Sequence, residues 1–176
     1  MEDTVYNITQ MLEWSSRSLE NIKTSEHSKI VIQDNFWSFI TGFKTSWYYF
    51  CRWTNEISPN LSKQEIKCLR INTIEEWKGN NLNESEVLAW DVLQKVRDNN
   101  THEKPIFPKI EEIDHFLDIG DGSFLDTGNG GFLITKQEVK YFITFEDEKY
   151  EIIELAINGL NAFKKLIKFI PKINKQ

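Results

Sequence analysis

Hydrophobic residues recur at intervals of three and four along the first half of the chain, which is the period of an amphipathic α-helix. This pattern predicts a helix over residues 4–24 and, after a polar break, a longer helix over residues 29–56. The stripe of the second helix is the most aromatic part of the chain and consists of Ile32, Phe36, Phe39, Ile40, Phe43, Trp47 and Phe50. Such a stripe is expected at the centre of the core or in a subunit interface.

Two further helices are predicted from their capping motifs. Ser62 is followed by Glu65, and Asn83 by Glu86, so each pair can satisfy backbone donors in a first helical turn. Apolar residues follow both motifs at helical spacing. The fourth helix is expected to fade over residues 97–100, before two prolines that a helix interior does not tolerate.

The last third of the chain changes to strand-like and turn-like patterns. Its expected order is a strand over 116–124, a turn over 126–131, a hairpin of 132–135 and 139–145 joined across Lys136–Glu138, and a final helix opened by Asp147. Because a hairpin alone is marginally stable, we expect this ribbon to pack on the helices.

These patterns predict one mainly α domain over residues 1–176. It is expected to be a bundle of about five helices, over about 4–104 and 148–170, with a small β ribbon over about 116–145 before the last helix.

Composition and charge narrow the classes of function. The formal net charge of −6 disfavours a broad, non-specific grip on nucleic acid, which depends on lysine and arginine neutralising phosphates. A locally basic cleft remains compatible with that charge. The N-terminal residues do not resemble a secretory signal, and no run of apolar residues approaches the length of a membrane span. We therefore expect a cytoplasmic protein that does not associate with a membrane.

Cys51 and Cys68 lie in apolar helical patterns and are expected in the core.

One short segment has a composition that packing does not explain. Arg97, Asp98 and Asn99 form a polar run at the end of the fourth helix, and His102 follows closely. Residues five apart on a continuous helix diverge by roughly 140°. If the helix instead frays after Asn99, Arg97 and His102 can converge on one cleft.

The chemistry of Arg97 and His102 suits RNA cleavage. A guanidinium is permanently charged and can hold a phosphate through two hydrogen bonds. An imidazole that titrates near neutral pH can take a proton from a 2′-hydroxyl or give one to a leaving oxygen. Asp98 or Asn99 would orient these groups. This reaction requires no metal or other cofactor, and none is expected.

In the segment from Arg97 to His102, the chain resembles the HEPN superfamily. Arg97, polar Asp98 and His102 match the Arg-x4-His form of that family's motif, at the end of a helix in a helical bundle. The long aromatic helix with Phe36, Trp37 and Phe43 would lie opposite in the same bundle. The resemblance covers about residues 4–104 and the last helix, with the ribbon as an insertion.

The resemblance implies a homodimer in which two Arg/His motifs meet and form one composite, metal-independent endoribonuclease site. Such enzymes leave a 2′,3′-cyclic phosphate, and many serve in toxin–antitoxin, antiphage or RNA-processing systems. RNA and a cognate antitoxin protein are therefore the expected partners.

Two other interpretations of the motif remain open. In the first, Arg97 is a surface partner of Asp98 or Glu103, Asn99 and Asn100 form a C-cap, and His102 is a solvated loop residue. In the second, the chain is a non-catalytic HEPN-like module for dimerisation or for binding protein or RNA. The negative charge of Asp98 would weaken phosphate binding and favours these alternatives.

Overall fold

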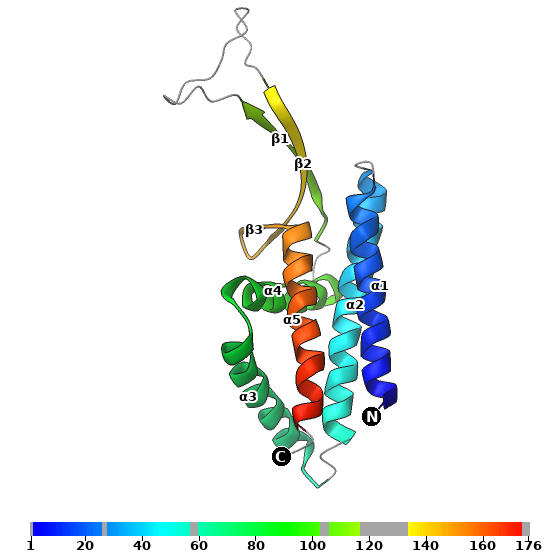
Figure 1. The fold of residues 1–176 in the computed structure, drawn as a ribbon, viewed down its shortest axis with the longest axis vertical. Helices are drawn as coiled ribbons and strands as arrows, with labels where there is room; N and C mark the ends of the chain where they lie inside the picture. The colour runs from blue at the N-terminus through cyan, green and yellow to red at the C-terminus, as the bar shows by residue number, and fades with distance from the viewer. Residues whose placement is uncertain (1, 26–27, 57–59, 103–105, 117–133, 174–176) are drawn as a thin grey trace, which may run out of the picture.

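The computed structural model describes residues 2–25, 28–56, 60–102, 106–116 and 134–173 (Figure 1). The elements within these ranges are α1 (Glu2–Lys23), α2 (Lys29–Glu56), α3 (Lys63–Asn81), α4 (Glu84–His102), β1 (Lys109–Phe116), β2 (Ile134–Phe145), β3 (Glu148–Glu151) and α5 (Ile152–Ile173). The chain is therefore mainly helical, with a small antiparallel sheet before the last helix, as the sequence predicts.

The helices form one bundle around an aromatic core. Helices α1 and α2 pack along one another, α4 packs mainly against α5 and also against α2, and α5 contacts α1. Helices α1, α2 and α5 run along the long axis of the molecule, α4 crosses them, and α3 lies along the edge (Figure 1). The ribbon of β1 and β2 extends beyond one end of the bundle.

Helices α1 and α2 approach each other closely because both carry small residues at their contact. A Cβ atom on Gly42 would lie 2.4 Å from Ser15 Oγ and 3.0 Å from the carbonyl oxygen of Met11. The Ser15 hydroxyl is buried and lies within hydrogen-bonding distance of the carbonyl oxygens of Met11 and Phe39, at 3.0 and 3.1 Å. A larger side chain at position 42 would therefore force the two helices apart.

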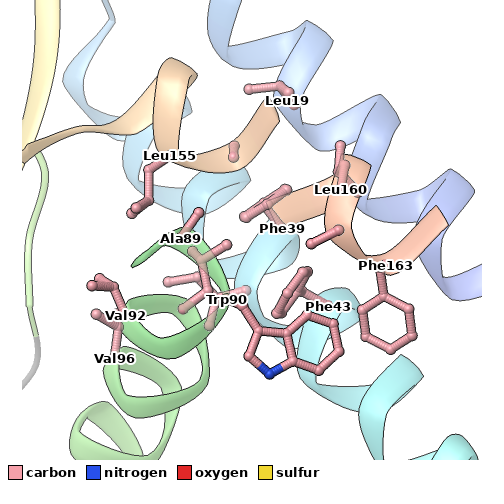
Figure 2. Close-up of a cluster of buried hydrophobic side chains, with 14 of the residues drawn as sticks. Leu19, Phe39, Phe43, Ala89, Trp90, Val92, Val96, Leu155, Leu160 and Phe163 are labelled. Carbon is pink, nitrogen blue, oxygen red and sulfur yellow. The ribbon is translucent and has the colours of Figure 1, made fainter. Parts of the chain in front are cut away.

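The aromatic stripe of α2 faces the core of its own chain. The ring centroid of Phe43 lies 5.3 Å from that of Phe163 and 5.9 Å from that of Trp90, and both pairs pack edge to face (Figure 2). Phe43 and Phe163 are fully buried, and Trp90 is 4% exposed. These contacts join α2, α4 and α5, so the stripe is occupied within one chain rather than in a subunit interface.

The capping motifs at Ser62 and Asn83 are confirmed. The Glu65 backbone N–H donates to Ser62 Oγ at 3.3 Å, and the Ser62 N–H donates to the Glu65 carboxylate at 2.8 Å. The corresponding distances between Asn83 and Glu86 are 2.9 and 3.0 Å.

The prediction that Cys68 lies in the core is wrong, because its side chain is exposed on α3. The side chain of Cys51 is half-buried.

The predicted hairpin across Lys136–Glu138 is wrong. These residues lie inside the continuous strand β2, where they pair with His115, Asp114 and Ile113 of β1. Where β2 extends beyond the bundle, it does not cover the hydrophobic core, so its side chains can be polar. The segment also contains no residue that favours a turn. The strand β1 is not predicted from the sequence. The expected strand over 116–124, except for its first residue, and the expected turn over 126–131 lie outside the described part of the chain, which omits residues 117–133.

The chain reverses instead at Glu146 and Asp147, whose φ angles are 51° and 64°. Two residues with positive φ are typical of the tight turns that join antiparallel strands. Residues 148–151, expected in the last helix, form the short strand β3. Helix α5 starts after Glu151, whose carboxylate accepts hydrogen bonds from the N–H groups of Ile153 and Glu154 at 3.1 and 2.6 Å.

Candidate functional site

Arg97 lies near the C-terminal end of α4, on a part of the helix that the core holds in place. Leu93 and Val96 are fully buried on the adjoining face. The Arg97 side chain itself is 38% exposed, and its Nη1 atom lies 3.7 Å from Asp98 Oδ1. The guanidinium thus projects from a rigid helix to a position that solvent reaches.

Asp98 connects α4 with the long aromatic helix. Its Oδ2 atom accepts a hydrogen bond from Lys44 Nζ of α2 at 2.9 Å. The Lys44 side chain is only 21% exposed, whereas that of Asp98 is 54% exposed. We call Lys44, Asp98 and Arg97 the α2–α4 charge cluster.

The α2–α4 charge cluster carries two positive charges and one negative charge. Its carboxylate lies between the two cations, so it partly neutralises both of them. Ion pairs at such exposed positions typically contribute 0–1 kcal/mol, so the cluster has little effect on the free energy of unfolding. Among these three side chains, the positive charges exceed the negative charges by one.

The backbone places His102 at the last position of α4, and the helix does not fray after Asn99. The condition under which Arg97 and His102 of one chain would converge, a helix that frays after Asn99, is therefore not met. On a continuous helix, positions 97 and 102 lie roughly 140° apart around the axis. One chain consequently does not present both positions on the same face. For residues 99–102, the structure describes the backbone and not the side chains.

The structure adds Lys44 to the residues that the sequence singled out. It brings Arg97 and Asp98 together and supplies Lys44 from a helix more than fifty positions earlier in the chain. The available signal is a lysine beside the apolar stripe of α2, next to Phe43. Such a lysine is usually a solvated side chain, so its spacing alone does not identify a site.

The described residues include no group of three or more histidine, cysteine, aspartate or glutamate side chains that could hold a metal ion. In the same part of the chain, each helix is too short or too polar to span a bilayer.

A scan against protein-family models and searches of curated proteins and of solved structures find no match to this chain. The HEPN resemblance therefore rests on the Arg97–His102 motif and on the helical architecture.

Proposed function

We propose that this chain is a HEPN-type, metal-independent endoribonuclease that acts as a homodimer. The observation that carries the proposal is the position of Arg97, which is solvent-accessible, shares the Asp98 carboxylate with a second cation and lies on a helix whose adjoining face is buried. A rigidly held guanidinium is suited to bind a phosphodiester in one orientation.

In the proposed reaction, Arg97 binds the scissile phosphate and His102 transfers protons. The 2′-oxygen attacks phosphorus and gives its proton to an imidazole. The bond from phosphorus to the 5′-oxygen breaks, and the leaving oxygen receives a proton from a protonated imidazole. The products are a 2′,3′-cyclic phosphate and a 5′-hydroxyl. Asp98 positions Arg97 and Lys44 beside the phosphate, and Asn99 helps to orient the motif.

The geometry of α4 supports a site shared by two chains. Because positions 97 and 102 lie roughly 140° apart on one helix, a single chain does not direct both toward one phosphate. A two-fold axis beside the end of α4 would bring Arg97 of one chain close to His102 of the second. The site is then incomplete in a monomer.

The resemblance to HEPN proteins also suggests the setting. We propose a cytoplasmic role in a toxin–antitoxin or antiphage defence system, with RNA as substrate and a cognate antitoxin protein as partner.

A second candidate function follows from Asp98. Its carboxylate lies between Arg97 and Lys44 and reduces the positive charge available to a phosphate. Together with the net charge of −6, this contact favours a non-catalytic HEPN-like module for dimerisation or for binding protein or RNA.

The purified parent protein is expected to cleave RNA in the presence of excess chelator, because its proposed proton-transfer groups are side chains. The measurement is gel analysis of several single-stranded and structured RNAs at low salt, followed by identification of the product ends. We expect 2′,3′-cyclic phosphate ends. If a folded, dimeric parent leaves all of these RNAs intact, the non-catalytic module becomes the better account.

A further inference from the structure

A pocket of ≈ 320 Å³ lies between α2, α3 and α4, and Lys44 is its one lining residue that belongs to the α2–α4 charge cluster. Its volume falls at the lower end of the range for small-molecule sites. Four of its lining residues are apolar: Trp47, Ile71, Ile74 and Trp90. Trp90 and Ile74 are buried, whereas Ile71 is 49% exposed, so the apolar wall reaches from the core to the mouth of the pocket.

Gln94 contributes an unpaired amide to the same pocket. Its Nε2 and Oε1 atoms are both shielded from solvent, and neither has a hydrogen-bond partner. Leaving a buried donor or acceptor unsatisfied costs about 1–3 kcal/mol. Gln94 is one of the lining residues of the pocket, so its side chain has to turn for both shielded atoms to reach a ligand there. A group that offers one acceptor and one donor would satisfy both of them.

Arg70 contributes a positive charge without a carboxylate partner among the described residues. Its Nη1 atom lies 3.3–3.5 Å from three neutral oxygens at the end of α2, which belong to Cys51, Thr54 and Asn55. These contacts hold the side chain against α2. The remaining N–H groups of the guanidinium can bind an anion.

The other charged side chains around the pocket already contact groups of opposite charge. These pairs are Lys44 with Asp98 at 2.9 Å, Lys95 with Glu146 at 3.2 Å, and Lys78 with Glu75 and Asp91 at 3.1 and 2.7 Å. An anionic ligand would therefore gain most from Arg70.

We propose that this pocket binds the carboxyl terminus of a peptide that ends in an aliphatic residue. The terminal carboxylate pairs with Arg70. The last peptide group offers both a C=O and an N–H, and these match the donor and acceptor of the Gln94 amide. The aliphatic side chain fills the space beside Ile71, Ile74 and the two tryptophans.

The arrangement of the aromatic rings favours this occupant over a nucleotide. Trp47 stacks on Phe50 with an interplanar angle of 22° and meets Trp90 edge to face at 88°. Trp90 also contacts Phe43, Trp77 and Phe163. Trp90 is buried among these rings, and Phe50 covers one face of Trp47, so the two indoles offer less open face for a base to stack on than free rings would. An aliphatic side chain packs well against ring edges.

The test is isothermal titration of the full chain with acetylated glycyl-glycyl-leucine. Its carboxamide form and adenosine monophosphate serve as comparison ligands. We expect the free acid to bind about 10–100-fold more tightly than the carboxamide, because the amide loses a charge-assisted hydrogen bond to Arg70. Equal affinity for the acid and the amide would overturn the proposal. Binding of the nucleotide alone, or of none of the ligands, would also overturn it.

Two variants assign the binding to this pocket. Arg70→Gln is expected to remove the preference for the free acid, whereas Arg52→Gln, on the exposed side of α2, should retain it. Gln94→Leu is expected to weaken binding at least about fivefold without lowering the melting temperature, because it replaces an unpaired amide by an apolar group of similar shape. A folded Gln94→Leu protein that binds the tripeptide as tightly as the parent would contradict the proposal.

Discussion

Alanine at Arg97 or at His102 is expected to slow RNA cleavage by about a hundredfold to ten-thousandfold. Loss of Arg97 removes the charge that stabilises the phosphate as negative charge develops in the transition state. Loss of His102 removes the proposed proton transfer, which typically contributes a factor of this size. The measurement is the initial rate of cleavage in excess chelator, on one RNA that the parent protein cuts efficiently.

Arg52→Ala is the matched control for the loss of a guanidinium. Arg52 lies on α2, its side chain is 65% exposed, and its partner Glu56 is one turn away on the same helix. We expect this variant to cleave at the parent rate, and all variants to unfold near the parent temperature. Parent-like cleavage by Arg97→Ala or His102→Ala would show that the proposed roles of these residues are wrong.

Replacement of Phe43 by alanine is expected to lower the free energy of unfolding by about 3–5 kcal/mol. The Phe43 ring is fully buried and contacts Trp90 of α4 and Phe163 of α5 (Figure 2). Its removal leaves a cavity where three helices meet, and these helices relax only partly into it. Urea unfolding followed by circular dichroism measures the change.

Tyr48→Ala is the control for Phe43→Ala, because it truncates an aromatic residue of the same helix that is 65% exposed. We expect a change of less than about 0.5 kcal/mol for this variant. If both variants lost similar stability, α2 would not direct its aromatic stripe into the core as described.

The helices could be predicted from sequence because their signals are local. The period of the apolar residues and the capping pairs at Ser62 and Asn83 depend on neighbours within one or two turns. The strands depend on distant partners. Lys136–Glu138 belong to a strand because β1 pairs with them, and no local feature reports that pairing. The end of α4 was also misjudged, since polar residues at a helix end do not by themselves stop the helix.

The candidate site was only partly predictable for the same reason. Arg97, Asp98 and His102 stand out because no packing pattern accounts for them. Lys44 reaches Asp98 only after α2 and α4 pack together. The pocket beside Gln94 likewise needs side chains from three helices. Spacing along the chain therefore identifies candidate groups, whereas tertiary packing decides which of them meet.

The shared site is tested most directly by mixing Arg97→Ala and His102→Ala chains after subunit exchange. A mixed dimer retains one Arg97 and one His102 at the shared site, while each variant alone lacks one kind of group altogether. We therefore predict that the mixture cleaves RNA at least about tenfold faster than either variant alone. If exchange is complete, the parent is active and the mixture is no faster than the separate variants, the two chains do not share one ribonuclease site.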